Sequence, residues 1–248
     1  MSVLEALAIA LAGVAAGTIN TIVGSGTLIT FPVLLALGYP PVVANVSNNV
    51  GLVPGSLSGA WGYRNELVGQ GRRVARLAVA SVTGGLLGAV LLLVLPGTAF
   101  RAVVPVFIAA AVVLVVLQPR IARRLGTGRG SGRWLGPGLV LCGMYGGYFG
   151  AAQGILLVSL LGLALAESLQ RINAIKNVLA MLVNLVAGVV FAIDGRVDWR
   201  VAGLIAVGAI VGGQIGAHVG QRMPPAVLRG VIVAVGLAAI VKLVYSST

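Results

Sequence analysis

The chain has 248 residues, of which 58% are hydrophobic and only 9% are charged. Because a water-soluble domain carries about 25% charged residues, this composition excludes a protein whose whole surface faces water. The formal net charge of +12 would indicate a nucleic-acid partner in a soluble protein, but in a membrane protein it is typical of cytoplasmic loops. We therefore expect the lipid bilayer as a partner and no nucleic acid.

Ten apolar stretches follow one another along the chain, and most approach the roughly 20 residues that a helix needs to cross a bilayer. They lie at about 3–23, 26–38, 43–63, 74–95, 99–118, 134–150, 154–166, 172–193, 200–219 and 226–245. All are predicted to be helices, because a barrel would show alternating strands. The stretches at 26–38 and 154–166 predict half-helices or tilted spans. The first stretch has no basic residues before it and no convincing cleavage site, so we expect a transmembrane segment rather than a signal peptide.

A polar stretch separates the first five segments from the last five. It contains Arg120, Arg123, Arg124, Arg129 and Arg133, interspersed with glycine and serine. This composition is typical of a flexible linker, and its charge predicts a cytoplasmic location. We therefore expect a first transmembrane repeat at 1–118, a basic cytoplasmic linker at 119–133 and a second transmembrane repeat at 134–248.

The two halves of the sequence match each other at a constant offset of 128 between residues 26 and 101. The matched pairs include Gly26 with Gly154, Asn45 with Asn173, Asn49 with Asn177, Gly84 with Gly212, and Gly88 with Gly216. A match of this length without a gap indicates an internal duplication, which is the usual construction of a secondary transporter.

The charges of the matched loops predict the orientation of the two halves. Loop 64–76 has four arginines and one acid, whereas loop 194–200 has two arginines and two acids. If the more basic loop lies in the cytoplasm, the other lies outside. We therefore predict an all-α polytopic membrane protein with two inverted-topology repeats. Each repeat would have about five hydrophobic segments, which gives 8–10 segments in the whole chain. These segments would include two short or broken helical hairpins. Trp61, Trp134 and Trp199 lie near segment ends, as interfacial anchors do.

The glycine-rich junctions before the two short segments are the first candidate site. Its residues are Gly24, Ser25, Gly26 and Thr27 in the first half and Gln153 and Gly154 in the second. A helix that is broken there exposes backbone N–H groups, and the N-terminus of the next half-helix attracts an anion. The alternative is a tight hairpin that serves only packing.

Polar residues within the following helix are the second candidate site. Asn45 and Asn49 share a helix face, as do Asn173 and Asn177. Asn48 lies beside the first pair, and Lys176 has the matching position in the second half. A buried ammonium group is costly without a partner, so the lysine predicts an anionic substrate. The alternatives are hydrogen bonds between helices for the asparagines and a lysine that reaches the membrane boundary.

Gln214 and His218 lie one helical turn apart and form a candidate proton relay, or a single hydrogen bond between helices. The chain has only one cysteine, one histidine and five acids. This inventory offers no metal cluster and no nucleophile with a base at usable spacing. We expect no metal, no cofactor and no enzymatic activity.

Several of these features resemble the TauE/SafE family of sulfite and organosulfonate exporters. The resemblance covers about residues 5–245 and rests on the duplicated glycine-rich hairpin with Pro32 after it, the Ala44–Asn49 segment, and the runs Gly84–Gly88 and Gly212–Gly216. The family typically has three glycines in the first hairpin, where this chain has Gly24-Ser25-Gly26, and its second hairpin is a looser match.

The resemblance implies a multi-pass protein of the bacterial or archaeal cytoplasmic membrane that exports small sulfur-containing anions such as sulfite or sulfoacetate. With the repeat, it predicts alternating access at a site between the two halves. An anion channel on the same scaffold and a transporter of another small organic anion stay open as alternatives. A membrane enzyme lacks a catalytic constellation, and a cation importer is disfavoured by the shortage of acids. We also leave open a homodimer.

Overall fold

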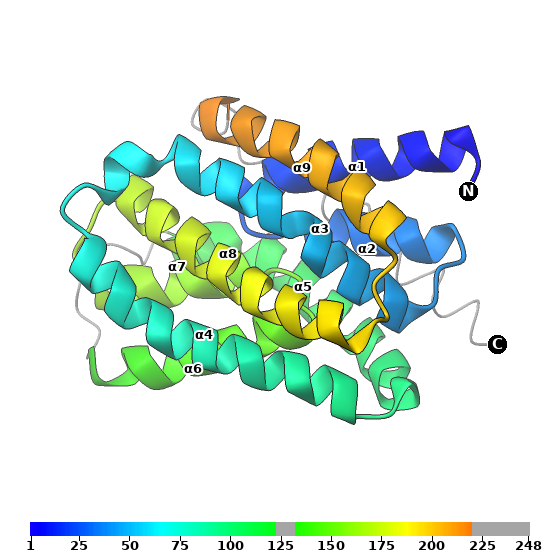
Figure 1. Cartoon of the computed structure of the whole chain (residues 1–248). Helices are drawn as coiled ribbons and strands as arrows, with labels where there is room; N and C mark the ends of the chain where they lie inside the picture. The colour runs from blue at the N-terminus through cyan, green and yellow to red at the C-terminus, as the bar shows by residue number, and fades with distance from the viewer. Residues whose placement is uncertain (123–131, 220–248) are drawn as a thin grey trace.

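The computed structural model describes residues 1–122 and 132–219, and this part of the chain is helical without a strand (Figure 1). Its α-helices are α1 (Val3–Ile22), α2 (Thr27–Ala36), α3 (Pro41–Gly62), α4 (Gly71–Val94), α5 (Gly97–Ala122), α6 (Leu135–Tyr148), α7 (Gln153–Ala164), α8 (Leu169–Asp194) and α9 (Trp199–Val219). Short 3-10 turns at Arg64–Leu67 and Gly132–Trp134 precede α4 and α6. The expected segment 226–245 and most of the linker 119–133, including Arg123, Arg124 and Arg129, lie outside the described residues.

Five of these helices are long and apolar enough to cross a membrane. They are Val3–Ile22, Gly71–Val94, Gly97–Leu117, Leu169–Asp194 and Trp199–His218. The segments that were expected to be short are helices of 10 residues in α2 and 12 residues in α7. The predicted class, an all-α polytopic membrane protein with two short helical segments, is therefore confirmed.

Two helical hairpins have the same turn. In hairpin 1, α1–α2, the N–H groups of Val23 and Gly24 donate to Ile19 O at 2.7 and 3.1 Å. In hairpin 2, α6–α7, Phe149 and Gly150 donate to Tyr145 O at 2.9 and 3.0 Å. Gly24 has φ +81° and Gly150 has φ +78°, a conformation that favours glycine at a helix end. These two glycines are 126 residues apart, whereas Gly26 and Gly154 after them are 128 residues apart. The tip of hairpin 2 is therefore two residues longer than the tip of hairpin 1.

Each half packs its first helix along the fourth helix of the other half: α1 along α9 and α6 along α4. Glycines make this close approach, because a methyl group on Gly17 would overlap the backbone of Ala209, and one on Gly143 would overlap that of Ser81. Gly17 and Gly143 match at the hairpin offset of 126, and Ser81 and Ala209 match at 128. The same contact therefore occurs twice.

Matched helices run in opposite directions (Figure 1). Helices α1, α3 and α9 run from right to left in this view, whereas α4, α6 and α8 run from left to right. The loop between α3 and α4 therefore lies at one end of the bundle and the loop between α8 and α9 at the other.

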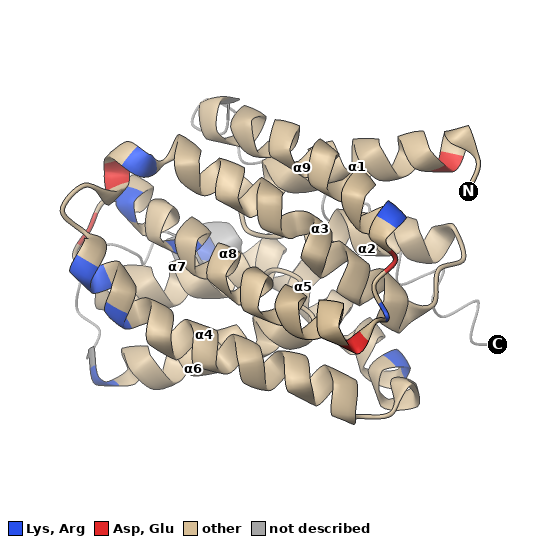
Figure 2. Cartoon of the chain, in the orientation of Figure 1, with Lys and Arg blue, Asp and Glu red and all other residues tan. Residues whose placement is uncertain are grey.

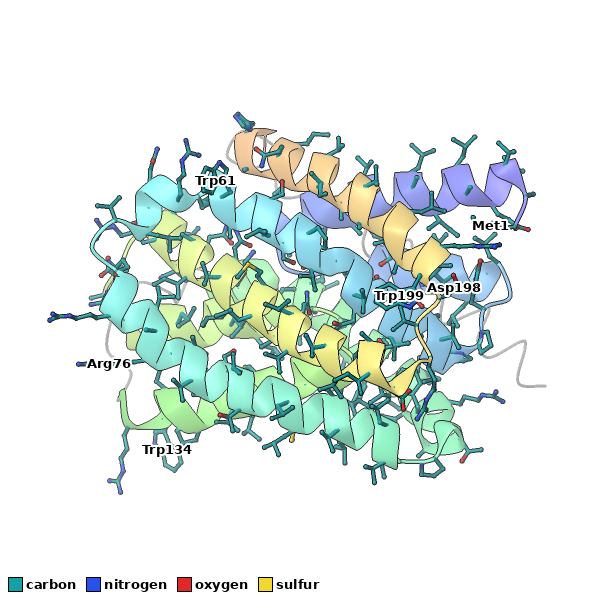
Figure 3. The ribbon with its side chains drawn as sticks, viewed as in Figure 1. Met1, Trp61, Arg76, Trp134, Asp198 and Trp199 are labelled. Carbon is teal, nitrogen blue, oxygen red and sulfur yellow. The ribbon has the colours of Figure 1, made fainter. Side chains whose placement is uncertain are left out.

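Charge is divided unequally between these two ends (Figure 2). We call the end that carries the loop 64–76, with its four arginines, the basic end. Figure 3 shows Trp61, Arg76 and Trp134 toward the basic end, and Met1, Asp198 and Trp199 toward the opposite end. All three tryptophans are exposed, in keeping with interfacial anchors.

An aromatic cluster supports the tip of hairpin 2. The ring of Phe149, which directly follows α6, lies 5.2 Å from Phe31 of α2, 6.0 Å from Phe100 and 5.9 Å from Phe107, the last two from α5. Aromatic pairs at such separations add to the free energy gained from burial. Helix α5 thereby positions the two hairpins against each other.

Candidate functional site

The tips of the two hairpins touch inside the bundle. The N–H of Gly154 donates to Gly24 O at 3.0 Å. A methyl group on either glycine would overlap the backbone of the other, so no larger residue fits at this crossing without a shift. The structure therefore brings together the two glycine-rich segments that the sequence analysis placed in one site.

Hairpin 1 carries open hydrogen-bond donors. Leu28 and Ile29 donate backwards to Ser25 O and Gly26 O at 3.1 and 2.9 Å. The N–H groups of Ser25, Gly26 and Thr27 precede this first turn and have no acceptor in the described part of the chain. Ser25 is 0% exposed, and its hydroxyl has no partner among the described residues either. This segment is a buried cluster of donors at the positive end of α2.

Hairpin 2 differs from this pattern. The N–H of Gln153 donates to Gly150 O at 3.2 Å, and that of Gly154 is used at the crossing with Gly24. The two backbone donors that were expected to face an anion here are therefore occupied in this structure. In the described part of the chain, the N–H groups of Ala151 and Ala152 have no acceptor, and the Gln153 side chain, which is 4% exposed, has no partner for its Nε2.

The asparagines of α3 hold the hairpins in place. Asn45 Nδ2 donates to Tyr148 O at 2.9 Å, at the C-terminus of α6. Asn48 Nδ2 donates to Thr27 Oγ1 at 3.2 Å and accepts from the Thr30 hydroxyl. Helix α3 therefore contacts α6 of hairpin 2 and α2 of hairpin 1, and these contacts are the interhelical hydrogen bonds named above as the alternative.

Helix α8 makes the matching contacts with hairpin 1. Asn173 Nδ2 donates to Thr21 O at 3.2 Å, and Lys176 Nζ donates to Asn20 O and Thr21 O at 3.0 Å each. Lys176 is 0% exposed, so its side chain does not reach the membrane boundary. The carbonyl groups at a helix C-terminus carry partial negative charge, so they stabilise the ammonium group. No acidic side chain in the described ranges pairs with it.

Helices α3 and α8 match at one asparagine of each half and differ at the charged position. Asn45 and Asn173 match in sequence, and each bonds a carbonyl at the end of the first helix of the opposite half. Asn48 bonds two threonines, whereas the matching Lys176 brings a positive charge. Lys176 uses two of the three donors of its ammonium group on α1. The polar centre of the protein therefore has a basic side chain on the side of α8.

Asn49 and Asn177, the two predicted site asparagines not yet described, lie next to this centre. Asn49 Nδ2 is 3.4 Å from Asn184 Oδ1, which joins α3 to α8. Asn177 is 4% exposed, and its Nδ2 has no partner within residues 1–122 and 132–219. Asn177 and Gln153 thus each present an unused amide donor.

The candidate proton relay is separate from these contacts. Gln214 Nε2 donates to Ser58 O at 3.0 Å and to Ser58 Oγ at 2.8 Å. His218 is exposed, and its Nδ1 lies 2.9 Å from Gln214 O in its own helix. Neither residue bonds the hairpins or Lys176, so the structure favours a hydrogen bond between helices for Gln214.

Comparisons with known proteins identify the family. A family model described as "Sulfite exporter TauE/SafE" matches residues 9–243. The chain belongs to the TauE/SafE family. It is similar to the probable membrane transporter protein YfcA of Escherichia coli (strain K12), with 28% identity over 186 residues that cover 71% of this chain and 68% of that protein. A probable membrane transporter protein of Haemophilus influenzae is 26% identical over 186 residues, 74% of this chain and 72% of that protein. No solved structure matches.

The matching family is a family of membrane transporters and not of enzymes, and the fold has five helices that are long and apolar enough to cross a membrane. This TauE/SafE member is therefore a multi-pass membrane transporter. The family model spans the tips of both hairpins and both asparagine pairs. The polar centre described above therefore lies within the matched region.

Ser56 and Asn184 of this TauE/SafE centre were missed by the sequence analysis, whereas Asn20 begins the first glycine-rich segment. Asn20 Nδ2 donates to Ser56 Oγ at 3.1 Å, and Asn184 bonds Asn49. A signal for both missed residues was present, because Ser56 and Asn184 match at the offset of 128 and lie two helical turns beyond Asn49 and Asn177.

Proposed function

We propose that this protein is a secondary transporter that exports a small sulfur-containing anion, such as sulfite, sulfoacetate or a related organosulfonate, across the cytoplasmic membrane. The observation that carries the proposal is a buried lysine, Lys176, which has no acidic partner among the described residues. It is bonded to the same hairpin whose tip presents the open N–H donors of Ser25, Gly26 and Thr27. Donors and positive charge in a buried site favour an anion. The sulfur chemistry rests on the description of the family.

Alternating access fits the closed state of the centre. Ser25 and Lys176 are 0% exposed, so a substrate reaches them only after the bundle opens. The two halves, with matched helices in opposite directions, form inverted repeats of a kind that lets one centre face each side in turn. The membrane potential drives an anion out of the cell by about 2.3 kcal/mol per charge per 100 mV, so export needs no coupled ion.

Binding and flux measurements test the proposal. The purified protein is screened against sulfite, sulfoacetate, thiosulfate, sulfate, taurine and acetate, and flux is then followed in proteoliposomes. We expect sulfite or an organosulfonate to bind and to show saturable flux, and zwitterionic taurine to bind more weakly. Flux that rises without saturation would favour the anion channel. Acetate bound more tightly than every sulfur anion would contradict the substrate class.

The orientation gives a separate prediction. In a Cys142→Ser background, we expect a cysteine at the exposed Arg196 to react with a membrane-impermeant thiol reagent in intact cells. A cysteine at Gly69 should react only after permeabilisation, because the more basic loop lies in the cytoplasm. Labelling of both positions in intact cells would exclude the inverted arrangement.

A further inference from the structure

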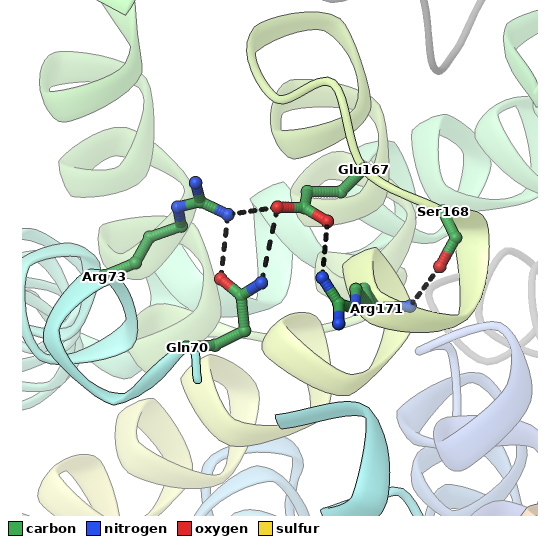
Figure 4. Close-up of polar contacts among 5 residues, drawn as sticks. All are labelled: Gln70, Arg73, Glu167, Ser168 and Arg171. Atoms are coloured by element: carbon green, nitrogen blue, oxygen red, sulfur yellow. Dashed lines mark hydrogen bonds and ion pairs between the residues drawn. The ribbon is translucent and has the colours of Figure 1, made fainter. Parts of the chain in front are cut away.

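A charged cluster joins the two halves at the basic end (Figure 4). The carboxylate of Glu167, in the loop between α7 and α8, forms ion pairs with Arg73 of α4 and, at 3.2 Å, with Arg171 of α8. Gln70 donates to the same carboxylate at 3.3 Å and accepts from Arg73 at 2.7 Å. We call Gln70, Arg73, Glu167 and Arg171 the basic-end clamp.

Glu167 is the centre of this clamp. Its side chain is 16% exposed, whereas the two arginines are 42% and 43% exposed. The hydrogen bond from Arg73 holds the pKa of the Glu167 carboxyl below its usual range, so the group stays ionised at neutral pH. A single exposed ion pair contributes little to stability. A carboxylate bound by three side chains from two distant segments instead fixes how those segments lie relative to each other.

The clamp connects elements of different halves. Arg73 and Gln70 belong to the start of α4 in the first half, whereas Glu167 directly precedes α8, the helix of the second half that carries Lys176. Opening the bundle at this end requires α4 and the start of α8 to separate. That separation breaks the contacts of Glu167 with Arg73 and Gln70.

The opposite end of the bundle has no such clamp among its described residues. At the offset of 128, Tyr39 matches Glu167, Asp198 matches Gln70 and Val201 matches Arg73. There the N–H of Asp198 donates to Ser47 Oγ at 2.8 Å, and no ion pair joins the halves in the ranges that the structure covers. Among the described residues, an ion pair therefore joins the halves at the basic end, whereas at the opposite end the Arg196 guanidinium donates to Leu93 O at 3.5 Å.

We propose that Glu167 is the residue that keeps the basic-end entrance of the transport path closed, through its contacts with Arg73 and Gln70. The inference rests on the alternating access and the cytoplasmic placement of the basic end proposed above. Loss of the Glu167 charge shifts the protein toward the state that is open to the cytoplasm. Locking the same contact covalently stops transport.

The first test measures opening without a substrate. A cysteine replaces Ala174, which is 0% exposed and lies on α8 between the clamp and Lys176, in a Cys142→Ser background. Its reaction with an impermeant thiol reagent is followed in inside-out vesicles. We expect Glu167→Gln to speed the labelling severalfold, up to about fivefold, because the ion pair with Arg73 that opening must break is lost from the closed state. Glu66→Gln is the matched control, since this acid of loop 64–76, also at the basic end, has no ion pair among the described residues and should leave the labelling rate unchanged.

The second test locks the clamp. Cysteines at Gln70 and Glu167, whose side chains lie 3.3 Å apart, are oxidised or cross-linked with a short thiol reagent. We expect sulfite flux in proteoliposomes to be lost and to return on cleavage of a reducible cross-link. Equal labelling of the Glu167→Gln and parent proteins, or full flux with the cross-link in place, would overturn the gate. Faster labelling without flux of any sulfur anion would support the gate and reject the proposed substrate.

Discussion

Replacing Gly154 with alanine is expected to destabilise the protein by about 2–4 kcal/mol and to abolish transport. The added methyl group would overlap the backbone of Gly24, and overpacking of this kind costs about 1–3 kcal/mol. The hydrogen bond from Gly154 to Gly24 O adds about 1 kcal/mol when the hairpins are forced apart. Thermal unfolding in detergent, together with flux in proteoliposomes, measures both effects.

Gly203→Ala is the matched control for this prediction. Gly203 also lies inside a helix, α9, but a methyl group there meets no atom within 4 Å. Alanine is a better helix former than glycine by up to about 1 kcal/mol, so this variant should be as stable as the parent or slightly more stable. If Gly154→Ala unfolds at the same temperature as Gly203→Ala, the crossing of the hairpins does not determine stability.

Removing the charge of Lys176 is expected to lower the affinity for the transported anion by about 100-fold or more, as loss of a charge-assisted hydrogen bond in a buried site does. Lys176→Met removes both the charge and the donor, so Asn20 O and Thr21 O lose their bonds to Nζ. Each buried group left without a partner costs about 1–3 kcal/mol, so this variant should also be less stable. Binding is measured by calorimetry and stability by thermal unfolding.

Lys176→Gln separates the two roles of the lysine. Glutamine keeps an N–H donor for the end of α1 but carries no charge, so we expect near-normal stability with weak anion binding. Arg200→Gln removes one positive charge from an exposed position at the opposite end and controls for net charge. Anion binding by Lys176→Gln that equals the parent would show that the lysine only caps α1.

Hydropathy and glycine spacing predicted most of the architecture, because both act through local physics. An apolar segment in lipid must satisfy its backbone internally, so helices such as α4 and α9 can be read from composition alone. Glycines at Gly24 and Gly150 indicate where the chain turns, since other residues rarely adopt positive φ. The match between Asn45 and Asn173 predicted that the two halves would make like contacts, and both bond a carbonyl of the opposite hairpin.

The partners of the polar residues required the tertiary structure. Lys176 bonds carbonyls that lie 155 and 156 residues away, and backbone carbonyls have no signature in the sequence. The sequence therefore predicted a buried lysine that needs a negative partner, but not that the end of α1 would provide one. For the same reason it assigned open backbone donors to both hairpins. Only the packed structure shows that Gly24 occupies the N–H of Gly154 while the donors of Ser25, Gly26 and Thr27 stay open.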